Sequence, residues 1–173
     1  MLEAGEYSAV ELSRSGRRVE IRALRPGDRA DLAAAVGRVS TQNLYHRFFA
    51  VKRSFTEQEI AFFLNVDFVN HVALVAVMEE GGRPVIIGGG RYIVVHPEKA
   101  EVAFDVIDQY QGQGIGTALM QHLGAIARGN GLKELIAEVL PDNISMLKVF
   151  EKSGLHVSTN CEPGVVHVSL RLQ

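Results

Sequence analysis

The sequence predicts an α/β domain built on a mixed sheet, with one parallel pair of strands among antiparallel ones. Strand-like and helix-like hydrophobic patterns follow one another in the order strand, helices, three strands, helix, strand, helix, two strands. A chain of 173 residues can bury one full core but is short for two. We therefore expect one domain over residues 16–173, and we expect residues 1–15 to fray or to pack on a partner.

The first third of the chain is predicted to hold one strand and several short helices. Residues 19–24 alternate between apolar and polar side chains, as a half-buried strand does. Helices are expected over residues 26–39 and 40–49, the first opened by a proline and the second capped by a serine. A capping box at residues 56–59 begins a third helix.

Three strands over residues 71–79, 84–95 and 100–107 are predicted to form an antiparallel meander, because only short turns separate them. The glycine run at residues 88–90 lies inside the second strand. Glycine in a strand interior indicates a bulge or a close approach of another group to the backbone.

The remaining sequence returns to alternating helices and strands. A helix is expected over residues 117–128, a strand over 132–140 and a second helix over about 143–153. Two strands near residues 155–158 and 165–172 complete the chain. Since the helix over 117–128 connects two strands of one sheet, we expect those strands to be parallel.

The segment Gln111-Gly112-Gln113-Gly114-Ile115-Gly116-Thr117 joins the third strand of the meander to the following helix. Its alternate glycines leave the backbone N–H groups at the helix start uncovered, and the helix dipole adds partial positive charge there. The segment therefore suits a phosphate or pyrophosphate. It is neither the G-x-G-x-x-G of a dinucleotide fold nor a P-loop, which needs a Lys-Ser/Thr pair.

Composition and charge exclude several classes of protein. A formal net charge of -2 gives no general attraction to nucleic acid or to an anionic membrane. No apolar run approaches the ~18 residues of a membrane-spanning helix. Cys161 is the only cysteine, and the histidines show no metal-binding spacing. We expect a cytoplasmic protein that binds no metal, nucleic acid or membrane.

The glycine segment also matches the pattern Q/R-x-x-G-x-G, at Gln111, Gly114 and Gly116. This pattern is the acetyl-CoA pyrophosphate loop of the GNAT superfamily of N-acetyltransferases, which the chain resembles over most of its length. Residues 135–143 are similar to the family's next strand and the asparagine after it. Residues 149–155 are similar to its Y-x-K-x-G-F block. The resemblance implies a GNAT-like acyl-CoA N-acyltransferase fold.

A narrower resemblance is to the bacterial Pat type of protein lysine acetyltransferase. It rests on residues 44–49, 66–76, 100–104 and 164–168. It implies a protein lysine as acceptor, while related stand-alone domains share these blocks and act on small amines such as amino acids, polyamines or aminoglycosides. A non-catalytic acyl-CoA-binding regulatory module is the alternative outside the enzyme class. Analogy with the family also implies a homodimer.

The resemblance implies acetyl-CoA as cosubstrate and assigns its contacts. The loop amides would bind the pyrophosphate, the strand end would pair with the pantetheine arm, and the Val106 N–H would point at the thioester carbonyl. Asn143 would either hydrogen-bond the pantetheine or cap the following helix. The residues expected to contact acetyl-CoA are Phe104, Val106, Ile107, Gln111, Gly112, Gln113, Gly114, Ile115, Gly116, Thr117, Asn143 and Phe150.

Transfer to an amine calls for a general base, because a lysine amine with a pKa of about 10.4 is almost wholly protonated near neutral pH. Glu101 is the candidate. Period-two alternation places it on the strand face opposite Val102 and Phe104, and it matches the catalytic glutamate of the Pat type. Other acids near this strand are weaker candidates: Glu98, Asp105 and Asp108.

One position departs from the family. Many members carry a tyrosine that protonates the leaving CoA thiolate at the position of Phe150. Phenylalanine cannot donate a proton, so either another group does or the thiolate leaves unaided, which a thiol pKa of about 8.5 permits. Tyr92 and Tyr110 are not supported by their positions in the sequence.

Overall fold

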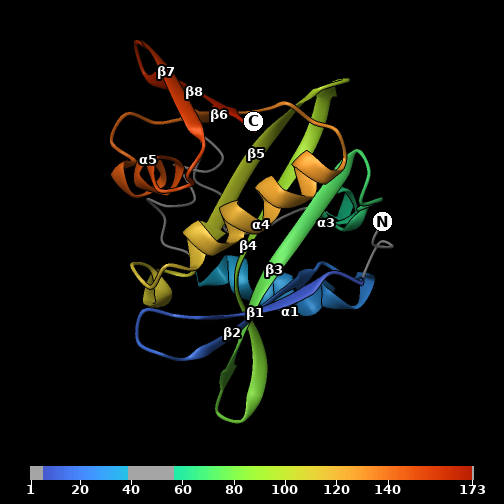
Figure 1. Ribbon diagram of the computed structural model, residues 1–173. Helices are drawn as coiled ribbons and strands as arrows, with labels where there is room; N and C mark the ends of the chain where they lie inside the picture. The colour runs from blue at the N-terminus through green and yellow to red at the C-terminus, as the bar shows by residue number, and fades with distance from the viewer. Residues whose placement is uncertain (1–5, 39–56, 173) are drawn as a thin grey trace.

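The computed structural model describes residues 6–38 and 57–172, which form one sheet flanked by helices (Figure 1). The predicted helix over residues 40–49 and the Pat-like block at 44–49 lie outside the described residues. The elements are β1 (Ser8–Leu12), β2 (Arg18–Ala23), η1 (Pro26–Asp28), α1 (Arg29–Gly37), α3 (Glu57–Leu64), β3 (His71–Glu80), β4 (Arg83–His96), β5 (Lys99–Val106), η2 (Asp108–Tyr110), α4 (Ile115–Gly129), β6 (Glu134–Val139), α5 (Ile144–Glu151), β7 (His156–Glu162) and β8 (Val165–Arg171).

In the described residues, eight strands lie in the order β1-β2-β3-β4-β5-β6-β8-β7. All neighbours are antiparallel except β5 and β6, which α4 connects as a crossover helix. In Figure 1, α4 crosses in front of β3, β4 and β5, and α1 lies behind the sheet. This architecture confirms the predicted mixed α/β sheet with one parallel pair.

The core lies between α4 and the middle strands. Leu119, Met120 and Leu123 recur at helical spacing on α4, and none of the three is exposed to solvent. β3 is buried along nearly its whole length because helices cover both faces of the sheet there. Burying each such leucine stabilises the fold by about 1.5–3 kcal/mol, and this packing fixes α4, and the loop before it, on the sheet.

The hydrophobic pattern of the sequence does not predict β1. Residues 8–12 pair with β2 from Ser8↔Arg22 to Leu12↔Arg18 and form one edge of the sheet. No residue of this strand is fully buried, so its hydrophobic alternation is weak. Pairing with β2, rather than a pattern of its own, makes it a strand.

The glycine run in β4 coincides with both features predicted for it. The register with β3 shifts between Ala76 and Val77, which leaves Ile87 as the extra residue of a bulge beside Gly88. A Cβ on Gly90 would lie 2.7 Å from the Phe104 ring and 2.9 Å from Leu123 of α4. Only glycine allows β5 and α4 to pack this closely on β4.

Candidate active site

The two parallel strands, β5 and β6, diverge about halfway along their length. β5 pairs with β6 only from Lys99↔Glu134 to Glu101↔Ile136, although β5 continues to Val106. Beyond Glu101 the ladder ends and an opening separates the strands. An edge of β5 with unpaired backbone groups can bind an extended ligand as an additional strand would.

A cavity of about 570 Å³ occupies this opening, a size typical of small-molecule sites. Its wall includes the outer part of β5, the end of β6, the glycine loop and one side of α5. Most of the residues predicted to contact acetyl-CoA line it: Phe104, Val106, Gln111, Gly112, Gly114, Ile115, Gly116, Thr117, Asn143 and Phe150.

Two predicted contact residues lie outside this wall. Ile107 is a core residue, only 2% exposed, and its N–H donates to the carbonyl oxygen of Ile87 at 2.8 Å. Gln113 turns its side chain inward, where its Oε1 is buried without a hydrogen-bond partner among the described residues. Ile107 and Gln113 are next to site residues in the sequence, but position along the chain does not determine the direction of a side chain.

The loop before α4 presents uncovered backbone N–H groups. Gly112 and Gly114 have φ angles of 76° and 85°, and no atom lies within 4 Å of the place where a Cβ would stand on either residue. Gly114 is the N-cap of α4, which begins at Ile115, two residues before the predicted helix start. Within the described parts of the chain, the N–H groups of residues 112–117 donate to no acceptor. Backbone donors that have no acceptor among the described residues, beside a helix dipole, fit an anion such as pyrophosphate.

The Val106 N–H points into the opening. The Ile107 N–H faces β4, where it bonds to Ile87, and successive N–H groups of a strand point to opposite sides. The Val106 carbonyl on the same side accepts a hydrogen bond from the Gln111 Nε2 at 3.1 Å. Gln111 therefore ties the end of β5 to the glycine loop while the neighbouring N–H stays available in the opening.

Glu101 pairs with Ile136 at the last paired position before β5 and β6 separate. Its side chain is exposed and lines the cavity. Phe104 contacts the α4 side of the sheet, because a Cβ on Gly90 would touch both Phe104 and Leu123. Strand alternation then places Glu101 on the opposite face. The glycine loop and the carboxylate thus reach the same opening from opposite faces of the sheet.

Among the residues that the structure describes, no tyrosine takes the place of a general acid. Phe150 is 1% exposed, and its ring packs on Phe104 with a centroid separation of 5.8 Å. Tyr110 lines the cavity, but its hydroxyl donates to the carboxylate of Glu80. Tyr92 is buried, and its hydroxyl accepts a hydrogen bond from the Asn130 Nδ2 at 3.0 Å.

Asn143 lines the cavity and caps α5. Its Oδ1 accepts a hydrogen bond from the Met146 N–H at 3.3 Å. This is the helix cap, one of the two roles expected for Asn143 from the sequence. The cap uses the oxygen of the amide and leaves the Nδ2 group as the part able to donate to a ligand. One side chain can therefore hold the helix and contact a ligand together.

Several cavity residues were missed by the sequence analysis. Those on α5 and at its C-cap recur at helical spacing and so share one helix face, a signal that could have found them: Ser145, Lys148, Val149 and Lys152. Glu138 on β6 follows Ile136, the partner of Glu101, by two residues, so both carboxylates lie on one face of the sheet. Arg14, from the β1–β2 hairpin, carries no local signal of a site.

Charge divides the cavity into two parts. The strand walls carry the carboxylates of Glu101, Asp105 and Glu138, and the α5 side and the hairpin carry Lys148, Lys152 and Arg14. A cation is therefore attracted to the β5 and β6 side, and an anion to the α5 and hairpin side. Within residues 6–38 and 57–172, no group of three His, Cys, Asp or Glu side chains could hold a metal ion. No helix in these ranges is long and apolar enough to span a membrane.

Comparison with known proteins gives consistent matches. The profile of the Acetyltransferase (GNAT) family matches residues 38–155. Acetyltransferase Pat of Mycolicibacterium smegmatis is 34% identical over 143 residues, which are 82% of this chain and 42% of that protein. Acetyltransferase PA5475 of Pseudomonas aeruginosa is 32% identical over 127 residues, which are 73% of this chain and 68% of that protein. The chain thus spans less than half the length of the first of these relatives.

Among solved structures, the GNAT domain of S. lividans PAT shares the whole fold. It superimposes with a TM-score of 0.85 and 33% identity, over 95% of this chain and 96% of that one. The similarity thus extends from the sequence to the arrangement of the sheet and helices.

Proposed function

Since the chain belongs to the Acetyltransferase (GNAT) family, we propose that it transfers the acetyl group of acetyl-CoA to a primary amine, with a protein lysine as acceptor. One observation carries the proposal: the opening between β5 and β6 joins an anion-binding loop on one face of the sheet to a carboxylate on the other. The choice of a protein lysine as acceptor is supported by the similarity to two Pat proteins, at 34% and 33% identity.

The donor side is formed by backbone groups. The free N–H groups of residues 112–117 bind the pyrophosphate, and the open edge of β5 pairs with the pantetheine arm. The Val106 N–H then donates to the thioester oxygen, on which negative charge develops during attack. One such donor is worth roughly 3–4 kcal/mol of the barrier.

The acceptor side is formed by acidic groups. Glu138 and Asp105 attract the ammonium, and Glu101 removes its proton. The amine nitrogen then bonds to the carbonyl carbon and forms a tetrahedral oxyanion, which the Val106 N–H stabilises. When the oxyanion collapses, the carbon–sulfur bond breaks, CoA leaves as the thiolate, and the extra proton on the nitrogen passes to water or to the thiolate. Tyr110 is the tyrosine among the described residues of the cavity wall, and its hydroxyl is held by Glu80, so departure of the thiolate without this proton donor fits the site.

The test is Glu101→Gln, with Glu98→Gln as matched control. Glu98 stands in the β4–β5 turn, outside the cavity, where it pairs with Lys133 at 3.3 Å. We expect Glu101→Gln to lower kcat by about 10²-fold or more and to leave the Kd of acetyl-CoA unchanged. The loss should shrink as pH rises toward the pKa of the amine, because a neutral amine needs no base. Equal turnover of the two variants at every pH would remove Glu101 as the base.

Release of CoA on a panel of acceptors tests the substrate. Lysine peptides turned over faster than polyamines, amino acids and aminoglycosides would support a protein acceptor. Turnover of small amines alone would favour the small-molecule alternative. Tight binding of acetyl-CoA without release on any acceptor would favour a regulatory module.

A further inference from the structure

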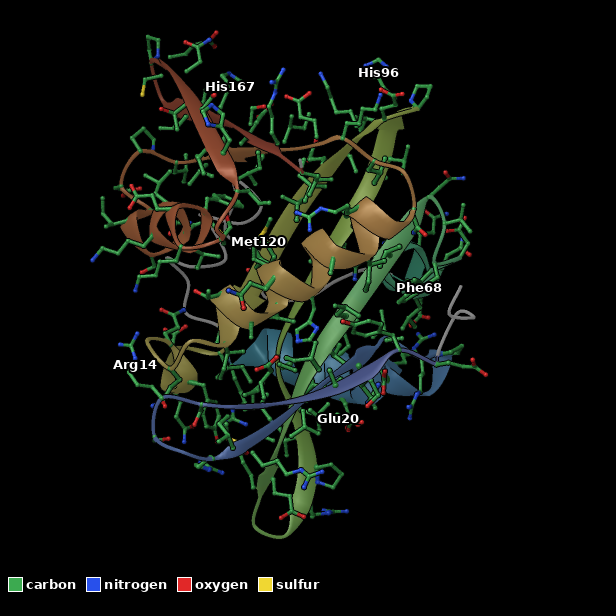
Figure 2. All side chains as sticks on the ribbon, viewed as in Figure 1. Arg14, Glu20, Phe68, His96, Met120 and His167 are labelled. Atoms are coloured by element: carbon green, nitrogen blue, oxygen red, sulfur yellow. The ribbon has the colours of Figure 1, made fainter. Side chains whose placement is uncertain are left out.

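The β1–β2 hairpin reaches the glycine loop. Its turn is closed by the Ser13 N–H to Arg17 carbonyl bond of 2.8 Å, and the Arg14 N–H donates to the Gln113 carbonyl at 2.9 Å. Figure 2 shows Arg14 at the end of this hairpin, beside η2. The turn is therefore attached by its backbone to the segment that carries the free N–H donors.

A second contact holds the same strand on α4. His122 on α4 joins its Nδ1 to the Tyr7 hydroxyl at 2.5 Å and its Nε2 to the Glu11 carboxylate at 2.8 Å. The hairpin is thus fixed to the helix and to the loop before it, so the side chain of Arg14 starts from a defined position.

The Arg14 guanidinium has no anionic partner among the described residues. Other arginines nearby are engaged: Arg17 donates to the Glu79 carbonyl at 2.6 Å and lies over the Tyr110 ring, and Arg22 pairs with Asp28 at 2.8 Å. Arg14 instead is exposed and lines the cavity beside Gly112 and Gly114.

These contacts place a planar cation next to a row of backbone donors. Guanidinium binds phosphate oxygens in a bidentate manner, and the dipole of α4 adds to the same positive potential. The carboxylates that line the same cavity stand on β5 and β6, at Glu101, Asp105 and Glu138. We propose that Arg14 binds a phosphate group of the CoA nucleotide, so that the hairpin forms part of the cosubstrate site. The proposal rests on the acetyl-CoA binding of the proposed function.

The experiment is calorimetric titration of CoA and dephospho-CoA into the wild type, Arg14→Ala, Arg14→Lys and Arg18→Ala. Arg18 is the matched control, because it begins β2 on the same hairpin, is exposed and lies outside the cavity. Arg14→Ala should raise the Kd of CoA about tenfold, Arg14→Lys should raise it less, and Arg18→Ala should leave it unchanged.

The two ligands identify the phosphate. If Arg14 contacts the pyrophosphate, Arg14→Ala weakens both ligands equally; if it contacts the 3′-phosphate, only CoA is weakened. Equal Kd values of CoA for the Arg14 and Arg18 variants would overturn the role of Arg14. The proposed function would still stand in that case, provided that the wild type binds CoA. Absence of CoA binding by the wild type would overturn both. The melting temperature without ligand should not change, because the Gln113 bond uses the backbone of Arg14.

Discussion

Two glycines of the loop act by different physical means. Gly114 needs its backbone angle, since φ is 85° and the space around a Cβ would be empty. Gly116 needs its small size, because a Cβ there would lie 3.2 Å from the Val149 methyl on α5 and 4.0 Å from Val106 on β5. One residue sets the turn into α4, and the other keeps the cavity open between three elements.

This difference predicts opposite outcomes for two substitutions. Gly116→Val should fill the cavity and abolish acetyl-CoA binding, with modest loss of folding stability. Gly114→Ala should lower the free energy of unfolding by about 1–2 kcal/mol through its left-handed conformation, with a smaller effect on binding. Calorimetry and urea unfolding of both variants measure the two quantities. Normal acetyl-CoA affinity in Gly116→Val would contradict the assignment of the loop.

At the scale of elements, an ion pair braces the short helix that leads into the loop. Arg38, after α1, donates to both oxygens of the Glu80 carboxylate at 2.8 and 2.9 Å, and the Tyr110 hydroxyl of η2 donates to one of them. The Arg38 and Tyr110 hydrogen bonds lower the pKa of Glu80 to about 2. The carboxylate therefore ties α1, β3 and η2 together in its charged form.

The lowered pKa predicts how stability depends on pH. A carboxyl group that is more acidic in the folded state stabilises it fully above its unfolded pKa, near 4.5, and loses this effect as pH falls toward about 2. Because the pair is partly exposed, we expect Glu80→Gln to cost only about 1 kcal/mol at pH 7. Urea unfolding at pH 7, 4 and 3 should show the difference shrinking with acidity. Glu79→Gln is the matched control, and a pH-independent difference would contradict the charged brace.

Across the whole molecule, the site lies where two parts of the sheet meet. Strands β1 to β5 are joined to β6, β8 and β7 by three paired positions between β5 and β6, by hydrogen bonds from the Lys133 and Glu134 N–H groups to the Glu98 carbonyl, and by the packing of α4. A ligand in the opening would contact β5, the loop and α5 together. Its binding should therefore stabilise the junction as well as fill a cavity.

Thermal unfolding measures this effect. At ~100 times its Kd, acetyl-CoA should raise the free energy of unfolding by about 2.7 kcal/mol, a shift in melting temperature of roughly 5–10 °C for a domain of this size. Gly116→Val should show no shift. If the wild type is not stabilised either, the anion-binding interpretation of the loop is wrong.

Local features of the sequence determined most of the fold. Hydrophobic periodicity located the meander, α4 and α5, because burial of one face imposes that period on the residues themselves. The glycine spacing located the loop, because a left-handed backbone angle or a close contact requires glycine at one particular position. These features also placed Glu101 on the strand face opposite Phe104, as the structure has it.

Tertiary structure alone decided how the site is assembled. The divergence of β5 from β6, the strand β1, and the approach of Arg14 and Glu138 to one cavity depend on contacts between residues far apart in the chain. Such contacts leave no period in the sequence. The inward turn of Gln113 belongs to the same class, because packing around a side chain, and not its position along the chain, decides which way it points.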